Sequence, residues 1–364
     1  MQVVALEVPQ LRSLSAVEIG LEGGIVSLIG ANGTGKTNLL EALHFALTGR
    51  SFRTADRREL IPFGERFARA EATVAGQAGR HRLLSSVSRT EGRRQLLDGA
   101  PVDPVTAARS RPPLAVFSPD RLALVKGPPA ERRAELDRFL AARWPSRAEL
   151  RQRYGQALAQ RNALLSRVAA GAAGAADLDS WDEALASAAE PLIAARAEAT
   201  SELAGHFAPA ASDLGLGGSA GLRYAPRAEG DRDAIRSGLA ERREADVRLG
   251  RSSWGPHLDE LILEGDERSL RRYGSQGQQR LALLALLFAQ RQALLRTSGG
   301  SSLLLLDDVM SELDPERREL LGGRLQSGGQ AIVTAADETA LPRQARECVI
   351  RMPGARRAPA AVAA

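Results

Sequence analysis

A glycine-rich loop near the start of the sequence constrains this chain more than any other segment. Residues 30–37 read Gly-Ala-Asn-Gly-Thr-Gly-Lys-Thr and satisfy the phosphate-binding pattern G-x-x-x-x-G-K-[ST] at every required position. An apolar run over residues 25–29 precedes the loop, and a helical pattern over residues 38–47 follows it. Strand, loop and helix in this order predict that a nucleoside triphosphate binds at the start of the helix.

Each residue type in the loop is suited to hold a triphosphate together with Mg²⁺. Glycines let successive backbone N–H groups turn toward anionic oxygens, and the helix that starts near Gly35 adds the positive end of its dipole. Lys36 is expected to reach the β- and γ-phosphates, and Thr37 is expected to ligate the metal. The predicted nucleotide-binding residues are Gly30, Ala31, Asn32, Gly33, Thr34, Gly35, Lys36, Thr37 and Asn38.

Two carboxylates at the end of a second apolar strand are expected to complete this site. Residues 303–306 are four consecutive leucines, and Asp307 and Asp308 follow them directly. Asp307 is the expected metal-side carboxylate, and Asp308, which points to the other side, is expected to polarise the attacking water. An ordinary strand capped by an acidic turn is the alternative. The predicted catalytic residues are therefore Lys36, Asp307 and Asp308.

Composition places the chain among ordinary globular proteins. Hydrophobic residues make up 44% of the 364 residues and aromatic residues 4%, so aliphatic side chains must fill the core. The longest apolar run, residues 281–288, is too short to span a bilayer, and the first residues lack a basic segment followed by an apolar one. We therefore expect a cytoplasmic protein without a membrane partner.

Charge and cysteine content limit which partners and metal sites the chain can have. The single cysteine, Cys348, excludes an internal disulfide framework and a cysteine-based zinc site, so Mg²⁺ bound with the nucleotide is the only metal implied. The formal net charge of +5 fits an anionic partner such as DNA. Almost every basic residue is an arginine, because Lys36 and Lys126 are the only lysines.

The pattern along the chain predicts one α/β domain that is split by a helical insertion. Short apolar runs alternate with turns up to about residue 130, and one helix interrupts them. Helical spacing then dominates residues 131–254, in segments 131–143, 147–168, 178–203 and 232–248, with loops expected at 169–176 and 215–221. Strand character returns over residues 255–352, and residues 353–364 are expected to form a flexible tail.

Two further motifs flank the paired carboxylates. Residues 273–280 read Tyr-Gly-Ser-Gln-Gly-Gln-Gln-Arg and lead into an apolar helix over residues 278–295. Small polar residues at a helix start favour an anion, although an ordinary capped helix remains the alternative. Residues 311–315 read Ser-Glu-Leu-Asp-Pro, where Ser311 or Asp314 can cap a helix over residues 316–321.

The order of these motifs resembles the head of ABC-type ATPases, including the SMC-like proteins of DNA repair. The resemblance implies an α/β fold, with a mixed sheet around the phosphate-loop helix and an inserted helical arm. It also implies a dimer of heads in which Ser275, Gly277 and Gln278 of one copy contact the γ-phosphate held by the other. Ser311 and Asp314 would then lie at the dimer interface.

Four segments narrow the resemblance to RecF, a family of bacterial recombination mediator ATPases. They are residues 117–137, with Pro119, Asp120 and Arg132-Arg133; residues 255–260, which read Gly-Pro-His-Leu-Asp-Glu; residues 273–280; and residues 305–321. Such proteins bind double-stranded DNA near single-strand gaps in the presence of ATP, and with RecR and RecO they help to load RecA. The resemblance thus implies an ATP-dependent homodimer with weak, DNA-stimulated ATPase activity.

The chain departs from the wider ABC pattern at several positions. Asp308 stands where many of these ATPases have glutamate, and a shorter side chain suits slow hydrolysis. No histidine occupies the switch position, for which Thr334 is a substitute, and Ser118 and Asp120 are the nearest candidates for the glutamine loop.

Candidate DNA contacts are Arg53, Arg57 and Arg58, which are equally compatible with a solvated surface. Two rival functions remain open. An ATP-gated dimeric scaffold would recruit repair proteins with little direct affinity for DNA, whereas a small-molecule kinase would leave residues 275–280 and 311–314 unexplained.

Overall fold

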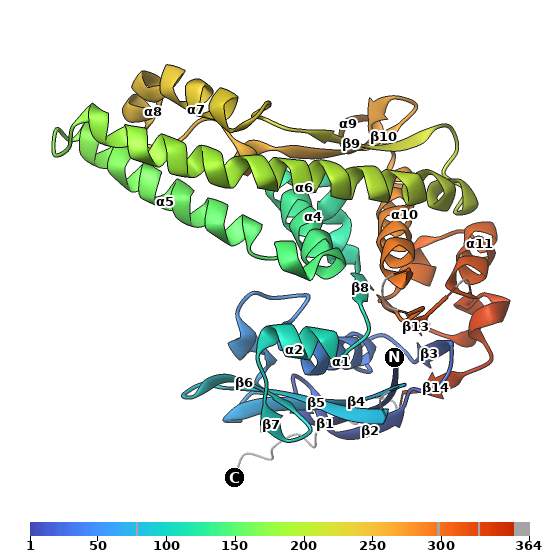
Figure 1. The fold of residues 1–364 in the computed structure, drawn as a ribbon. Coiled ribbons are helices and arrows are strands. Elements are labelled where there is room, and N and C mark those ends of the chain that lie inside the picture. Colours follow the sequence, from blue (N-terminus) through green and yellow to red (C-terminus); the bar gives the residue numbers. More distant parts are fainter. Residues whose placement is uncertain (78, 297–298, 327, 353–364) are drawn as a thin grey trace, which may run out of the picture. The chain divides into compact units, whose positions relative to one another are not determined.

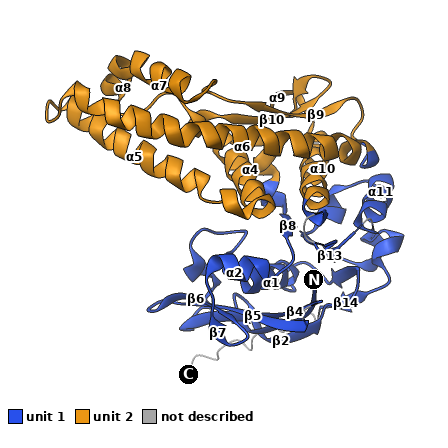
Figure 2. Ribbon diagram, in the orientation of Figure 1, with its two compact units in different colours: residues 1–121, 213–215, 294–364 blue, residues 122–212, 216–293 orange. Residues whose placement is uncertain are grey.

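The computed structural model describes residues 1–77, 79–296, 299–326 and 328–352 (Figure 1). The expected tail, residues 353–364, lies outside the described residues. The chain divides into two compact units (Figure 2). Unit 1 comprises residues 1–121, 213–215 and the described part of 294–364, and unit 2 comprises residues 122–212 and 216–293.

A parallel sheet in unit 1 positions the phosphate loop. Its strand order is β14-β3-β13-β12-β8. The strands are β3 (Ile25–Ile29), β8 (Leu114–Phe117), β12 (Leu303–Leu306), β13 (Gln330–Ala335) and β14 (Val349–Arg351). Because the strands are parallel, their carboxyl ends meet at one edge. The phosphate loop, which follows β3, therefore lies at the same edge as the carboxylates that follow β12.

A second sheet in unit 1 is antiparallel, with strand order β2-β1-β4-β5-β6-β7. The strands are β1 (Gln2–Leu11), β2 (Leu14–Gly20), β4 (Phe67–Gly76), β5 (Gly79–Ser88), β6 (Gly92–Leu97) and β7 (Ala100–Pro101). Helix α1 (Lys36–Thr48) lies between the two sheets, and one hydrophobic core joins them, with Leu6, Leu43 and Ile332 among its members (Figure 1). The predicted mixed sheet around a phosphate-loop helix is thus confirmed.

Unit 2 is built on long helices and a small sheet. The helices are α3 (Ala123–Lys126), α4 (Pro129–Arg143), α5 (Leu150–Ala169), α6 (Leu178–Asp213), α7 (Arg232–Glu241), α8 (Arg243–Leu249), α9 (Leu270–Tyr273) and α10 (Gln276–Leu295), whose last two residues belong to unit 1. The sheet has the order β11-β10-β9, from β9 (Ala220–Ala225), β10 (Glu260–Gly265) and β11 (Arg268–Ser269). Helix α6 continues through Pro191 and Pro209.

The insertion differs from its predicted outline in three places. Strand β9 begins inside the segment expected to be the loop 215–221, because its backbone pairs with β10 rather than with a local partner. The helix expected over residues 232–248 is two helices that meet at Arg242. Helix α10 falls mostly in unit 2, whereas the sequence pattern groups it with residues 255–352.

Short elements complete the described chain. Unit 1 also contains α2 (Pro104–Arg109) and α11 (Pro315–Gln326). The 3₁₀ helices are η1 (Arg57–Leu60), η2 (Pro119–Leu122), η3 (Pro145–Arg147), η4 (Ala175–Asp177), η5 (Pro256–Leu258), η6 (Val309–Glu312), η7 (Glu338–Ala340) and η8 (Arg343–Ala345). Within the described residues, no helix has both the length and the apolar character needed to cross a membrane.

Residues 255–260, one of the segments that carry the family resemblance, have a structural role in unit 2. Asp259 is almost fully buried and accepts hydrogen bonds from Arg196 Nη1 at 3.0 Å, from the Arg227 backbone N–H at 2.8 Å and from the Tyr224 hydroxyl. Arg196 also donates to both carboxylate oxygens of Asp137, at 2.8 and 3.0 Å. This network ties α4 and α6 to β9 and to the start of β10.

A second buried ion cluster holds the helices of the arm together. Arg161 on α5 has no exposed surface and donates to Asp182 on α6 and to Asp246 on α8, each at 2.7 Å. Asp182 and Asp246 are also fully buried. Removing the cation would leave two buried carboxylates with reduced compensation, which is the costly way to break such a cluster.

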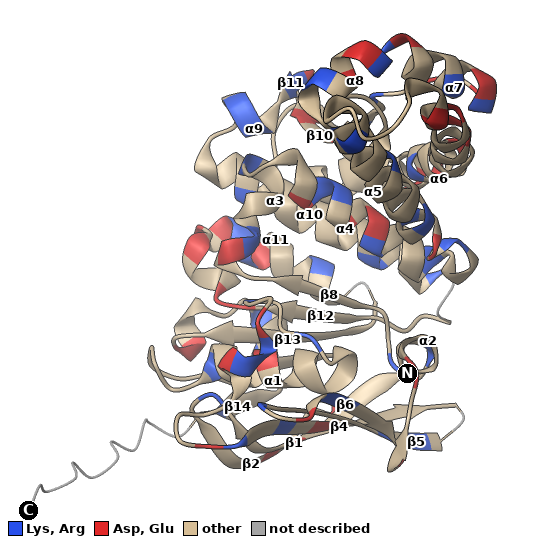
Figure 3. Ribbon diagram, turned by 90° about the vertical axis from the view of Figure 1, so that its left-hand side faces the viewer, with Lys and Arg blue, Asp and Glu red and all other residues tan. Residues whose placement is uncertain are grey.

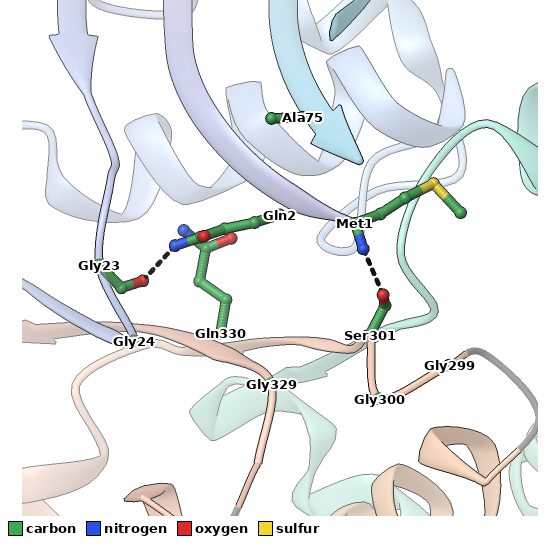
Figure 4. A pocket seen from close by; sticks show the side chains of 10 residues that line it. All are labelled: Met1, Gln2, Gly23, Gly24, Ala75, Gly299, Gly300, Ser301, Gly329 and Gln330. Carbon is green, nitrogen blue, oxygen red and sulfur yellow. Dashed lines mark hydrogen bonds between the residues drawn. The ribbon is translucent and has the colours of Figure 1, made fainter. Parts of the chain in front are cut away.

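A hollow of about 560 Å³ lies at the opposite edge of the parallel sheet from the phosphate loop (Figure 4). Gly23, Gly24 and Gly329 line it beside the amino-terminal ends of β3 and β13, together with Gln330. No side chain of Lys, Arg, His, Asp or Glu is among its described lining residues. This hollow is therefore unsuited to a triphosphate, and the charged groups described below lie at the other edge.

Candidate nucleotide-binding site

The phosphate loop has the backbone geometry that its sequence predicts. Gly33 and Gly35 have φ angles of 85° and 94°, in the region that favours glycine. A Cβ atom on Gly30 would lie 2.9 Å from Thr34 Oγ1, so a side chain at Gly30 has no room. Lys36 Nζ bends over the loop and donates to the carbonyl oxygens of Gly30 and Ala31. The lysine head is thereby held where the loop residues converge.

Donors for an anion remain available in this loop. In the part of the chain that the structure describes, the backbone N–H groups of Gly33 and Gly35 have no protein acceptor. They lie immediately before helix α1, whose amino-terminal dipole also favours negative charge. Loop and helix together form a cradle for phosphate oxygens.

The expected metal ligands come together at the carboxyl edge of the sheet. Thr37 Oγ1 donates to Asp307 Oδ1 at 2.9 Å, although the two residues are 270 positions apart. Asp307 is buried, and its burial raises the pKa of the carboxyl group despite hydrogen bonds from Thr37 and Thr334 that oppose the shift. A buried carboxylate beside a hydroxyl is a costly arrangement that a bound cation would stabilise.

Thr334 links the two catalytic candidates. Its hydroxyl donates to Asp307 Oδ1 at 3.0 Å and accepts the backbone N–H of Asp308 at 2.8 Å. Thr334 is fully buried on β13, the neighbour of β12. The residue proposed from sequence as the switch substitute therefore contacts both carboxylate residues.

Asp308 adopts an unusual backbone conformation. Its φ and ψ angles are 50° and 28°, in the left-handed region. Aspartate and asparagine tolerate this region better than most other non-glycine residues. The Ser311 hydroxyl donates to the Asp308 carbonyl oxygen at 2.8 Å, which closes the turn after the strand. The Asp308 side chain is partly exposed and thus accessible to water.

The donor set at this edge fits Mg²⁺ with a bound triphosphate. Mg²⁺ prefers oxygen ligands and is commonly held by one or two protein groups plus phosphates and water. Thr37 and Asp307 supply a hydroxyl and a carboxylate oxygen. Ser118, one residue after β8, adds a buried hydroxyl oxygen with no hydrogen-bond partner among the described residues. No cluster of three or more His, Cys, Asp or Glu suited to a metal occurs in the described chain.

A buried glutamate organises the other side of the phosphate-loop helix. Glu41 is fully buried and pairs with Arg12, whose Nη2 donates to Oε1 at 2.9 Å. Arg53 Nη1 donates to Glu41 at 3.3 Å and to Asn38 Oδ1 at 3.1 Å. Asn38 in turn donates to Ser13 in the turn between β1 and β2. Neither Glu41 nor Arg12 was predicted from the sequence, although a glutamate within the apolar helix 38–47 indicates a buried ion pair.

Ser275 and Gln278, which with Gly277 we call the signature residues, form a capping box at the start of α10. The Ser275 hydroxyl accepts the Gln278 backbone N–H at 3.2 Å, and Gln278 Oε1 accepts the Ser275 backbone N–H at 2.8 Å. Both residues are exposed, and Gly277 lies between them. The capped-helix alternative is therefore present in the structure, and the role of these residues in trans stays a prediction.

The two residues predicted for the dimer interface are also exposed. Asp314 caps α11, because its Oδ1 accepts the Arg317 backbone N–H at 2.9 Å. Ser311 lies in η6. Of the candidate DNA contacts, Arg58 is exposed and Arg57 is partly exposed, whereas Arg53 pairs with Glu41. The predicted roles of these residues at a dimer interface and on DNA stay predictions.

Comparisons with known proteins agree with this geometry. A family model described as the RecF/RecN/SMC N terminal domain matches residues 2–355. The chain is 35% identical to the DNA replication and repair protein RecF of Heliobacterium modesticaldum, over 90% of each chain. It is 36% identical to the protein of the same name from Anaeromyxobacter sp. strain Fw109-5, over 93% of each.

Solved structures show the same fold. A structure described as the recombination mediator protein RecF-ATP in the RecFOR pathway superposes with a TM-score of 0.86 at 23% identity, covering 96% of this chain and 95% of that one. An SMC head bound to the C-terminal winged-helix domain of ScpA gives a TM-score of 0.58 at 16% identity, covering 96% and 94%.

Proposed function

The chain belongs to the RecF family of DNA replication and repair proteins, and from this premise we propose that it is an ATP-dependent recombination mediator of the cytoplasm. It binds ATP and dimerises, binds double-stranded DNA near single-strand gaps, and works with RecR and RecO to load RecA. The hydrogen bond of 2.9 Å between Thr37 and Asp307 carries the proposal, because it joins the phosphate loop to the catalytic carboxylates.

Slow hydrolysis of ATP follows from the arrangement of the carboxyl edge. Lys36 and the amides of Gly33 and Gly35 would bind the phosphate oxygens, and Thr37 and Asp307 would hold Mg²⁺, whose charge would offset the negative charge of the triphosphate. Asp308 orients water for attack in line with the γ-phosphate, and Thr334 fixes its backbone. The short side chain of Asp308 reaches the water less well than a glutamate would.

ATP controls dimerisation because two copies of the chain contact the same nucleotide. Ser275, Gly277 and Gln278 of a second copy approach the γ-phosphate, so ATP stabilises the dimer and its hydrolysis removes that contact. Within the capping box the Ser275 oxygen accepts a hydrogen bond, but its hydroxyl hydrogen remains available as a donor. The exposed start of α10 can therefore keep its cap while it donates to phosphate.

Sedimentation of the full chain with Mg²⁺ and ATP tests this proposal. Wild type, Lys36→Met and Ser275→Arg are compared with and without a gapped DNA duplex. Gln152→Arg, at an exposed position on α5, is the matched control because it adds the same charge elsewhere in unit 2. We expect wild type and the control to dimerise with ATP and to bind the duplex more tightly, and we expect both site variants to remain monomeric.

Different results separate the parts of the proposal. If Ser275→Arg still dimerises normally with ATP, the role of the signature in trans is wrong. If ATP drives dimerisation without any gain in DNA affinity, the chain acts as an ATP-gated scaffold for repair proteins. An ATPase assay with and without duplex tests whether DNA stimulates hydrolysis.

A further inference from the structure

Four arginines gather in unit 1 near the carboxyl-terminal end of α1. They come from three separate segments, and their charges act on one another: Arg50 and Arg57 on Arg93, and Arg50 on Arg111. We call Arg50, Arg57, Arg93 and Arg111 the arginine cluster. Arg93 on β6 lies over the end of α1, since a Cβ atom on Gly49 would be 2.8 Å from Arg93 Nη1. Arg50 follows Gly49, and its carbonyl oxygen lies 2.7 Å from His44 Nδ1. Figure 3 shows basic segments on β6 and beside α2.

The cluster lacks the acidic partners that many other arginines of this chain have. Among the described residues, no carboxylate lies within 4.0 Å of any of its four guanidinium groups. The Arg57 and Arg93 side chains have no protein hydrogen-bond acceptor in the described chain, and Arg111 donates to a single one, the Pro112 carbonyl oxygen at 3.3 Å. Glu41, the buried carboxylate on α1, is already engaged by Arg12 and Arg53.

The charges within the cluster repel one another. Burial lowers the pKa of Arg93, and the charges of Arg57 and Arg50 lower it further. Burial together with Arg50 lowers the pKa of Arg111 to about 10, so the group still carries its charge at neutral pH. The partial negative charge at the carboxyl-terminal end of α1 offsets part of this repulsion, and a bound anion would offset more of it through the unused donors.

The cluster is separate from the ATP site. Helix α1 runs from Lys36 to Thr48, which is about 18 Å at 1.5 Å per residue, so the two groups of cations lie at opposite ends of one helix. An anion at the cluster is consequently not the γ-phosphate held by Lys36.

We propose that the arginine cluster binds phosphates of the backbone of double-stranded DNA, an inference that rests on the DNA binding proposed above. The planar guanidinium group presents paired donors that match phosphate oxygens. Of the three arginines suggested by sequence alone, only Arg57 belongs to the cluster. Arg50, Arg93 and Arg111 are new assignments, and Arg53 is left out of the cluster because its Nη1 already pairs with Glu41 and Asn38.

Neighbouring positions on β6 give a matched pair of variants. Arg93 belongs to the cluster, whereas the side chain of Arg94 is 72% exposed and pairs with Glu91. Successive side chains of a strand point to opposite faces, so Arg93→Gln and Arg94→Gln remove the same charge on the two sides of one strand. Arg50→Gln, at an exposed position, provides a second cluster variant whose folding is not at risk.

The experiment measures the affinity of the full chain with ATP for a labelled gapped duplex between 50 and 200 mM salt. Each lost phosphate contact reduces the slope of log affinity against log salt by about 0.9. Over this fourfold range, wild type should therefore lose about 3.5-fold more affinity than Arg93→Gln or Arg50→Gln. Arg94→Gln should retain the wild-type slope, and ATP binding should be unchanged in all variants.

Three results would overturn the inference. If both cluster variants keep the wild-type slope while wild type binds DNA, the cluster does not contact phosphate, and the proposed function still stands. If Arg94→Gln reduces the salt slope as much as Arg93→Gln does, DNA responds to the general surface charge and not to a specific site. If wild type with ATP does not bind DNA, the proposed function fails together with this inference, and an acidic protein surface becomes the ligand to test.

Discussion

Replacing Thr334 by valine isolates the contribution of one hydroxyl to hydrolysis. The change keeps the volume and the β-branched shape of the side chain, so it leaves no cavity in β13. It removes the donor to Asp307 Oδ1 and the acceptor for the Asp308 backbone N–H. Thr334 acts through these two residues rather than on ATP, and we expect hydrolysis to suffer while nucleotide binding remains.

The structure sets the size of the effect. The part-buried Asp308 backbone N–H would be left without its acceptor, which costs up to about 3 kcal/mol, and the lost hydrogen bond to the Asp307 carboxylate contributes about 1.5–3 kcal/mol. We expect the free energy of unfolding to fall by about 2–5 kcal/mol. Because misplacing a catalytic group by about 1 Å lowers the rate roughly 100-fold, kcat should fall by about that factor.

Steady-state phosphate release and binding of a fluorescent ATP analogue distinguish binding from hydrolysis. Thr334→Ser is the control, since it keeps the hydroxyl, and its kcat should stay near the wild-type value. Urea unfolding of all three proteins gives the stability difference. If Thr334→Val hydrolyses ATP at the wild-type rate, the hydroxyl does not position Asp308 and the reasoning fails.

Three other variants test separate features. Burial lowers the pKa of His44 from 6.5 to about 4. The free energy of unfolding is therefore highest above pH 6.5, where His44 is neutral, and it falls by up to about 3 kcal/mol as the pH drops toward 4. In urea unfolding, His44→Asn should lose less stability than wild type over that pH range. Arg161→Met should lower the free energy of unfolding by about 3 kcal/mol, against at most about 0.5 kcal/mol for Arg153→Met, whose ion pair is exposed. Asp308→Asn should unfold at the wild-type temperature, because asparagine accepts the left-handed conformation, yet should hydrolyse ATP much more slowly; a large drop in melting temperature would show that the carboxylate is structural.

The parts of the fold that sequence predicted share one property. Strands β3 and β12 have the predicted bounds, because each is a largely apolar run that the parallel sheet buries. Strands β2, β6 and β9 were missed, and each exposes part of its surface, so none is a continuous buried apolar run. Strands β2 and β6 pair with the strands next to them in the chain, β1 and β5, whereas β9 pairs with β10, which lies beyond α7 and α8 in the sequence. Local patterns carry no information about such a partner.

The candidate site divides in the same way. The phosphate loop and the paired carboxylates could be predicted because their chemistry depends on adjacent residues. The contacts of Thr334 with the Asp307 carboxylate and the Asp308 backbone, the burial of Glu41 and the arginine cluster depend on segments that only the folded chain brings together. The sequence predicted a helix start at Ser275, but the two reciprocal hydrogen bonds of its capping box are seen only in the folded chain.

The left-handed backbone at Asp308 bears on why this position holds aspartate. A longer glutamate would reach water more easily, but most residues other than glycine, asparagine and aspartate pay about 1–2 kcal/mol to adopt that conformation. The main chain thus favours the slower carboxylate before any chemistry takes place. The backbone conformation of this turn would then determine how long ATP stays bound before hydrolysis. A faster enzyme would require a different turn and not only a different side chain.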